Sequence, residues 1–251
     1  MTLDRLVAIP SLRGPARVHR GYPLIAVSVE LIERAVNRAI ELRGTVMLAV
    51  REDERRWCAV CAAVDGSIEL RVGEPGSAWR RGERRRGEAW LREHGFVHVL
   101  DAWANPIAPA MSPWSCAQIL DDALREGVSV PAGAELVEVL VHPGVIGTAD
   151  PPPPEASHAE HIGFALRALA QRGRGKLVIE GGRPASAWAW AFVSDGELVL
   201  SPESRDDEWK MPLAADGDLA ATADRLTDGR DPEAPLFISC MPLEPSDPPL
   251  L

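Results

Sequence analysis

The sequence lacks a long hydrophobic run: none of its apolar stretches approaches the roughly 18 to 20 residues that a membrane-spanning helix needs. The first ten residues include Asp4 and Arg5 and show no basic segment followed by a long apolar one, so no secretory signal is expected. Glycine (21) and proline (22) make up about 17% of the 251 residues, below the roughly 25–30% typical of low-complexity chains. With 46% hydrophobic residues, the chain is expected to fold around a packed core. Because neither a membrane span nor a secretory signal is expected, the protein is expected in the cytoplasm.

Cysteine and lysine are both scarce. Four cysteines without an expected secretory signal indicate reduced thiols rather than a disulfide framework, and each is interpreted as a small apolar residue. They are Cys58, Cys61, Cys116 and Cys240. Only two of the 27 basic side chains are lysines, Lys176 and Lys210.

The common catalytic and nucleotide-binding motifs are missing. There is no phosphate-binding G-x-x-x-x-G-K-[ST] loop, and residues 173–178 fail the last position of G-x-G-x-x-G and lead into an expected strand instead of a helix. Neither G-x-S-x-G nor H-E-x-x-H occurs. These absences favour a binding protein over an enzyme, with no nucleotide or other cofactor.

Two groups of potential metal ligands are considered and set aside. Cys58 and Cys61 have redox or zinc spacing, but on a strand residues three apart point to opposite faces. His158 and His161, with Glu160 nearby, could approach a metal from the start of a helix, yet no further ligand is defined. A solvated helix N-terminus explains the two histidines as well, so no metal site is expected.

The charge is unevenly distributed along the chain. The formal net charge is −10, but residues 1–94 are net basic and the excess of acidic residues lies in 95–251. Such a summed field repels phosphate, so nucleic-acid binding is not expected. The one basic cluster is Arg80, Arg81, Arg84, Arg85, Arg86 and Arg92. Because acidic residues alternate with these arginines, the cluster is interpreted as a solvated helix face, with a docking surface for an acidic peptide or another subunit as the alternative.

Hydrophobic periodicity and turn residues predict the same order of elements twice. The first series has a helix at 27–43, strands at 45–50, 57–64 and 67–72, helices at 82–94 and 112–126, an extended segment at 96–103 and a strand at 135–142. The second has a helix at 158–172, strands at 176–180, 185–193 and 197–201, a helix near 218–226 and a strand at 236–240. Asp-Gly turns join the last two strands of each meander. The repeat suggests an internal duplication within an α+β fold.

Proline and glycine mark the expected boundary between the two series. Residues 143–157 include four consecutive prolines, which favour a stiff linker. We therefore expect an N-terminal extension at 1–26, a first α+β domain at 27–142, the linker at 143–157, a shorter second α+β domain at 158–242 and a tail at 243–251.

An aromatic stripe is the most informative feature of the second series. In residues 185–193, simple alternation places Trp188, Trp190 and Phe192 on one face of a strand and small alanines on the other. The alanines suit a closely packed helix. The aromatic face is expected to be covered, either by the protein's own core or by a second subunit or a client.

Four segments of the first series resemble the superfamily of type III secretion chaperones and YbjN-like proteins, in particular the actinobacterial TY-Chap domains. They are a strand at 68–70, an L-x-x-x-G-[WF] segment within 90–96, a proline-bearing piece at 101–106 and a closing helix at 116–124. The resemblance implies two tandem chaperone-like units and a non-enzymatic protein that binds another protein, such as a client or an effector. It supplies no catalytic residues.

Four functions follow as hypotheses. The first is a secretion-chaperone-like adaptor that binds a partner through Trp188, Trp190 and Phe192 or through the arginine cluster. The second is an immunity or regulatory protein that neutralises a toxin or enzyme. The third, less favoured than the first two, is a small-ligand-binding enzyme that uses His158 or His161. A nucleic-acid binder is the fourth. A homodimer is possible, although the two halves could pair with each other instead.

Overall fold

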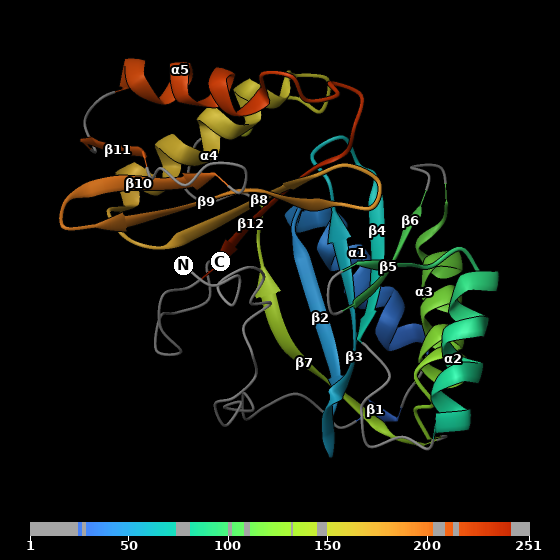
Figure 1. Cartoon of the computed structure of the whole chain (residues 1–251). Coiled ribbons are helices and arrows are strands. Elements are labelled where there is room, and N and C mark those ends of the chain that lie inside the picture. Colours follow the sequence, from blue (N-terminus) through green and yellow to red (C-terminus); the bar gives the residue numbers. More distant parts are fainter. Residues whose placement is uncertain are drawn as a thin grey trace.

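Two antiparallel sheets organise the computed structural model, which describes residues 25–26, 29–73, 81–99, 102–107, 111–131, 133–144, 150–202, 209–212 and 216–241. The first sheet has the strand order β1-β7-β2-β3-β4-β6-β5, and the second has β11-β10-β9-β8-β12 (Figure 1). The α+β class expected from the sequence is confirmed.

The first unit contains three α-helices and the seven strands of the first sheet within the described residues. Its strands are β1 Ile25–Ala26, β2 Thr45–Val50, β3 Asp53–Ala62, β4 Ile68–Gly73, β5 Val97–Val99, β6 Ala102–Ile107 and β7 Glu135–His142. Its helices are α1 Val29–Leu42, α2 Arg81–Glu93 and α3 Pro113–Asp122, the last continued by a π-helical turn at Ala123–Gly127.

The second unit contains two described α-helices and the five strands of the second sheet. The helices are α4 His158–Arg172 and α5 Asp216–Thr227. The strands are β8 Lys176–Gly181, β9 Ser186–Ser194, β10 Glu197–Pro202, β11 Trp209–Pro212 and β12 Leu236–Met241.

The two units share a common arrangement of elements, to which the first unit adds β1, α2 and β5. In each, a helix precedes a three-stranded meander, a later helix packs against the first one (α3 on α1, α5 on α4), and the last strand returns to pair with the first strand of the meander. Thus β7 lies beside β2, and β12 lies beside β8. The order of elements expected from the sequence is present twice. The short strands β1 and β11 were not expected from the sequence, and β3 begins four residues earlier than expected. The single extended segment expected at 96–103 is instead the antiparallel pair β5 and β6, which reaches residue 107.

Local signals explain where several helices begin and end. The side chain of Ser157 accepts a hydrogen bond from the Glu160 amide, and the Glu160 carboxylate accepts one from the Ser157 amide, which forms a capping box at the start of α4. The same helix ends at Gly173, whose φ of 69° is the left-handed conformation that glycine adopts easily. Ser112 caps α3 and Pro113 occupies its first turn.

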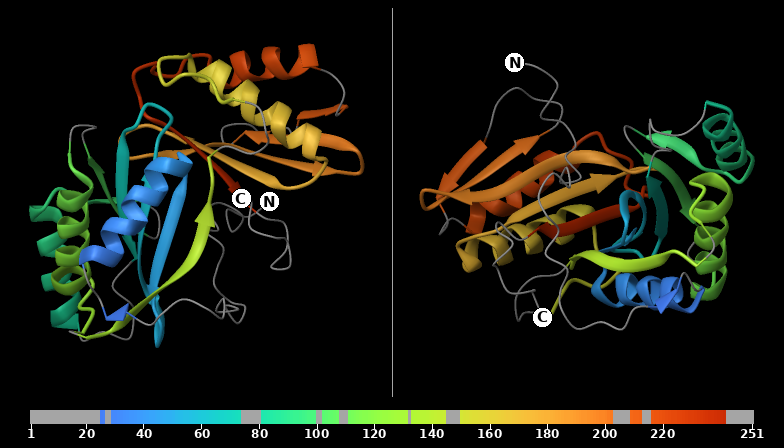
Figure 2. Two further views of the ribbon diagram at one scale, coloured as in Figure 1. Left: turned by 180° about the vertical axis from the view of Figure 1, so that it is seen from behind. Right: turned by 90° about the horizontal axis from the view of Figure 1, so that it is seen from below.

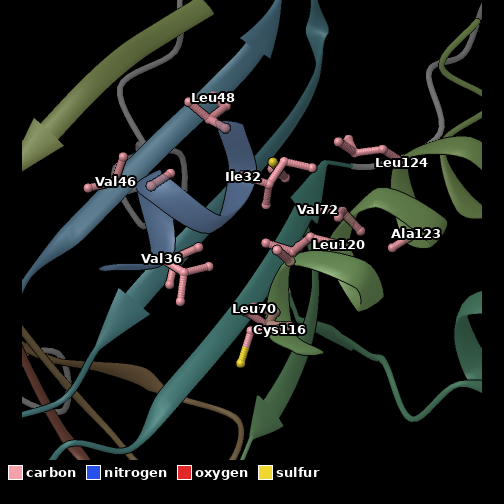
Figure 3. Packing of buried hydrophobic residues seen from close by; sticks show 14 of the residues in the cluster. Ile32, Val36, Val46, Leu48, Leu70, Val72, Cys116, Leu120, Ala123 and Leu124 are labelled. Atoms are coloured by element: carbon pink, nitrogen blue, oxygen red, sulfur yellow. The ribbon is translucent and has the colours of Figure 1, made fainter. Parts of the chain in front are cut away.

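The core of the first unit lies between one face of the first sheet and the helices α1 and α3 (Figure 3). Alternate residues of β2 and β4 point to this side and meet buried residues of both helices. The members labelled in Figure 3 are Ile32, Val36, Val46, Leu48, Leu70, Val72, Cys116, Leu120, Ala123 and Leu124. Viewed from behind, α1 crosses in front of β2, so this helix layer covers only that side of the sheet (Figure 2).

The two units are joined by direct contacts as well as by the intervening chain. The Val64 amide donates to the Leu236 carbonyl at 2.9 Å, and the Cys240 amide donates to the Pro143 carbonyl at 2.9 Å. A small buried cluster also combines residues of both units: Cys61, Ala63, Ala185 and Phe237. The segment at 150–157 is held by a hydrogen bond from the Arg43 guanidinium to the Pro152 carbonyl.

Candidate functional site

Each sheet carries its helices on one face only, as far as the described residues show. In the second sheet, alternate strand residues such as Leu177, Ala191 and Leu200 form a core with Leu166 and Leu169 of α4. The residues between them therefore point to the opposite side, where no described helix lies. Seen from below, β8, β9 and β10 lie in front of α4 and α5 (Figure 2).

We call this opposite side the helix-free face of the second sheet. Away from the first unit, its members are Lys176, Val178, Trp190, Phe192, Val199, Ser201 and Lys210. Glu180, Phe237 and Ser239 lie on the same side, where the first unit contacts it. Cross-strand pairing places them in adjacent rows: Val178 lies opposite Trp190, and Phe192 lies opposite both Lys176 and Val199. Trp190 and Phe192 are both half-buried.

A β-bulge removes Trp188 from this face. The pairing of β8 with β9 shifts at this point: Ile179 pairs with Ala189 and Glu180 pairs with Ala187, so Trp188 has no partner. An extra residue in a strand reverses the alternation beyond it. Trp188 is consequently 3% exposed and belongs to the core beside α4.

The expectation that Trp188, Trp190 and Phe192 share a face is therefore wrong for Trp188 and right for the other two. The Trp188 ring lies edge-on to the His158 ring at 5.7 Å, and the Arg230 guanidinium lies 5.1 Å above it. A Cβ atom on Gly181 would come within 2.1 Å of the same ring, so a glycine is needed there. The alanines Ala189 and Ala191 face the helices, as expected from their small size.

Both lysines of the chain lie on the helix-free face of the second sheet. Lys176 pairs with Phe192, and its ammonium group lies 6.0 Å from the centre of the Trp190 ring. Partial burial lowers the pKa of Lys176 below its usual value. Lys210 is exposed on β11, directly opposite Val199. In a chain of net charge −10, this face thus combines aromatic rings with positive charge.

The two aromatic residues of this face were expected from the sequence, whereas the two lysines were not. Their positions depend on which strands pair and in what register, which a local pattern does not contain. The available signal was compositional: lysine is rare among the 27 basic side chains, and both lysines fall within the second sheet.

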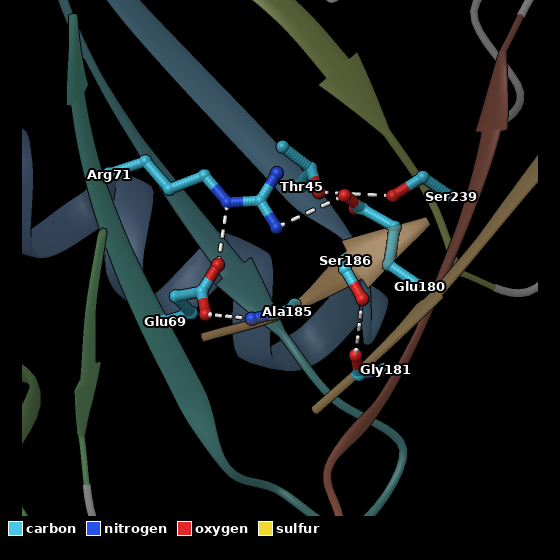
Figure 4. A network of polar contacts seen from close by, with 8 residues as sticks. All are labelled: Thr45, Glu69, Arg71, Glu180, Gly181, Ala185, Ser186 and Ser239. Atoms are coloured by element: carbon cyan, nitrogen blue, oxygen red, sulfur yellow. Dashed lines mark hydrogen bonds and ion pairs between the residues drawn. The ribbon is translucent and has the colours of Figure 1, made fainter. Parts of the chain in front are cut away.

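The first sheet also has a face without a described helix, and one end of this face contacts the second unit. Arg71 on β4 points to this side, because its neighbours Leu70 and Val72 point into the helix-covered core. The Arg71 guanidinium donates to Glu69 at 2.7 Å and to Glu180 of β8 at 3.2 Å (Figure 4). The second Glu69 oxygen accepts the Ala185 amide at 2.7 Å.

This polar network is buried, and its one guanidinium pairs with both carboxylates. The side chains of Glu69, Arg71 and Glu180 are 2%, 13% and 17% exposed. Close by, the Thr45 and Ser239 hydroxyls share a hydrogen bond at 3.0 Å that also crosses between the units. Because each charge has an opposite charge in contact, the arrangement suits a structural joint between the units better than an acid or base of catalysis.

The histidines considered as metal ligands have other surroundings. Burial lowers the pKa of His158 and of His161, and these side chains meet the carbonyls of Ala234 and Pro153 respectively. His161 is 4% exposed, and its Nε2 atom has no hydrogen-bond partner among the described residues. Within the described part of the chain, no three His, Cys, Asp or Glu side chains gather closely enough to hold a metal ion.

The cysteine pair is also separated, as the strand geometry predicted. Cys58 lies in the helix-covered core of the first unit, whereas Cys61 lies on the other side in the cluster between the units. Burial raises the pKa of Cys58 to about 12 and that of Cys61 to about 11, so both thiols are unreactive near neutral pH.

The arginine cluster belongs to α2, on the outer side of the first unit. Arg80 lies outside the described residues, as does the side chain of Arg81. Arg84 and Arg85 are exposed, and Arg84 forms an ion pair with Glu88 at 2.8 Å, which fits a solvated helix face. Figure 1 shows α2 and β9 on opposite sides of the molecule, so the structure does not bring the arginines and the aromatic stripe together.

None of the described helices is both long enough and apolar enough to cross a membrane. Comparisons with protein-family models, curated proteins and solved structures find no match to this chain.

Proposed function

We propose that the protein is a non-enzymatic binding module, an adaptor that captures a partner protein on the helix-free face of the second sheet. One observation carries the proposal: Trp190 and Phe192 lie half-buried on a sheet face that no described helix covers, between Lys176 on β8 and Lys210 on β11. Aromatic side chains in such positions are the residues that most often dominate protein interfaces.

The geometry and charge of this face indicate the chemistry of the partner. Trp190 and Phe192 are two residues apart along β9, roughly 6.8 Å, which is also the spacing of alternate side chains in an extended segment. Val178 lies beside Trp190 on β8 and widens the apolar surface that such a segment can contact. Lys176 and Lys210 flank the rings and attract negative charge. The proposed partner therefore presents an extended segment with apolar and acidic side chains.

The family resemblance supports an adaptor of the secretion-chaperone type. It rests on four segments of the first unit, and the repeated order of elements extends it to the second unit by topology. The four cysteines are unpaired and buried, which favours the reducing environment of the cytoplasm as the place of action. Chaperone-like activity, internal duplication and cytoplasmic location are parts of this proposal.

Site-specific crosslinking in the source cell tests the proposal. A photoreactive phenylalanine analogue is introduced in place of Ser201, which lies opposite Trp190, or in place of exposed Arg85 on α2 as the control. We expect one protein to be crosslinked from position 201 and not from position 85.

Binding of the identified partner is then measured by calorimetry. Trp190→Ala is expected to weaken binding about 30-fold, as for a tryptophan that contributes about 2 kcal/mol at an interface. Arg85→Ala should leave affinity unchanged. Equal affinity for the wild type and Trp190→Ala, with weakened binding by Arg85→Ala, would reject the sheet face and favour α2 as the docking surface.

A further inference from the structure

The residues that follow β12 have the composition that the helix-free face of the second sheet would recognise. Residues 242–251 read Pro-Leu-Glu-Pro-Ser-Asp-Pro-Pro-Leu-Leu and lie outside the described residues. They contain four prolines, two acidic residues and no basic one. Proline-rich segments favour the extended polyproline II conformation, which binds to aromatic surfaces with little loss of conformational entropy.

The segment also starts in the right place. It follows Met241, the last residue of β12, whose backbone pairs with Lys176 at one end of the helix-free face. From β12 to β11 there are four strand spacings, roughly 19 Å in all. Ten residues in the polyproline II conformation extend roughly 31 Å, so the segment can cross the whole face and reach Lys210.

The charges are complementary along this path. Glu244 and Asp247 are the two acidic residues of the segment, and Lys176 and Lys210 are the two basic residues of the face. Partial burial of Lys176 beside Trp190 makes an acidic neighbour more favourable there than at an open surface. The segment also contains three leucines, whose side chains match the apolar character of Val178 and Phe192.

We propose that residues 242–251 bind the helix-free face of the second sheet of the same chain and act as an internal competitor of the partner. The intramolecular contact stands on geometry and charge alone, whereas the competition rests on the proposed function. A tethered segment this short has an effective concentration in the millimolar range, so a partner must bind with higher affinity or carry more acidic and apolar groups to displace it.

Disulfide formation in the full-length chain tests the contact without any partner. The variant Ser201→Cys/Ser246→Cys places one thiol on the face and one in the middle of the segment. The matched control, Ala221→Cys/Ser246→Cys, places the first thiol on the exposed surface of α5, on the other side of the sheet. The native cysteines do not interfere, because all four are buried and burial raises their pKa values.

We expect the face variant to form an intramolecular disulfide at pH 8 at least about ten times faster than the control, since bridging requires Cα atoms within about 7 Å. Adding Glu244→Lys/Asp247→Lys should slow the reaction of the face variant and leave the control unchanged. Equal rates for the two cysteine pairs would overturn the inference.

The same variants separate this inference from the proposed function. If the disulfide forms fast but Trp190→Ala does not change the affinity for the partner, the internal contact is supported and the proposed docking site is rejected. If the disulfide forms no faster than in the control but Trp190→Ala weakens partner binding, the docking site is supported and the internal contact is rejected. If both hold, the Glu244→Lys/Asp247→Lys variant should bind the partner more tightly than the wild type, and unchanged affinity would refute competition.

Discussion

Replacing Arg71 by methionine should destabilise the protein far more than a comparable change at the surface. Arg71 provides the only cation that contacts Glu69 among the described residues, and the Glu69 side chain is 2% exposed. Methionine replaces the apolar stem of the side chain and lacks the guanidinium group and its charge. Glu69 would retain the Ala185 amide as a hydrogen-bond donor, but its negative charge would be buried without compensation. Breaking a buried ion pair in this way costs about 3–5 kcal/mol.

Urea denaturation at pH 7 measures this cost, with Arg38→Met as the matched control. Arg38 also forms an ion pair with a glutamate on another element, Glu138 at 2.8 Å, but these side chains are 30% and 27% exposed. Solvent screens such a pair, so the control should lose at most about 1 kcal/mol. For a chain of this size, the Arg71→Met loss corresponds to a fall in melting temperature of roughly 6–20 °C.

A second variant shows whether the buried charge is the cause. In Glu69→Gln/Arg71→Met, the neutral amide oxygen can still accept the Ala185 amide, and the deeply buried charge at position 69 is gone. Only Glu180, whose side chain is 17% exposed, then lacks its arginine. This double variant should recover a large part of the stability that Arg71→Met loses. The reasoning would be refuted if Arg71→Met cost no more than Arg38→Met, or if the double variant were as unstable as the single one.

Three further outcomes are expected from single features of the structure. Burial lowers the pKa of His142 from 6.5 to about 4, so the unfolded chain takes up a proton first as the pH falls. About 3 kcal/mol of stability should be lost between pH 6.5 and 4, and His142→Gln should flatten that part of the denaturation profile. A Cβ atom on Gly87 of α2 would lie 2.2 Å from a carbonyl oxygen of the π-helical turn, so Gly87→Ala should destabilise the protein by about 1–3 kcal/mol in thermal denaturation. A Cβ atom on Gly82 of the same helix would have nothing within 4 Å, so the control Gly82→Ala should be neutral or slightly stabilising. Trp188→Ala should lose about 3–5 kcal/mol in denaturation because its ring is in the core, and Trp190→Ala, two residues away, should lose clearly less; similar losses would contradict the assignment to opposite sides of the sheet.

The elements of the fold were predictable because their signals are local. Ser157 with Glu160, Gly173, and the Asp-Gly turns at Asp65 and Asp195 each act within a few residues, and the structure places a cap or turn at each. Strand alternation likewise predicted correctly that Cys58 and Cys61 point to opposite sides.

The expectation that was wrong, and the contacts that were not expected, depend on residues far apart in the sequence. Whether β9 alternates regularly through Trp188 is decided by its pairing with β8, where the bulge lies, and no property of residues 185–193 alone shows it. The contact between Arg71 and Glu180 joins residues 109 positions apart in the sequence. The candidate site was therefore half predictable: its aromatic residues stand out locally, while its lysines and its boundary with the first unit require the tertiary structure.

The return of the last strand in each unit has a consequence for synthesis on the ribosome. The first sheet can close when β7 has emerged at residue 142, but the second must wait for β12 at residue 241. At 5–20 residues per second, this leaves the first unit alone for roughly 5–20 s. During that time Glu69 and Arg71 are without Glu180 and Ala185, and they can pair with each other in water. The ionic contact between the units is thus compatible with stepwise folding, because the part of the sheet face that carries Glu69 and Arg71 stays hydrated until the second unit has folded against it.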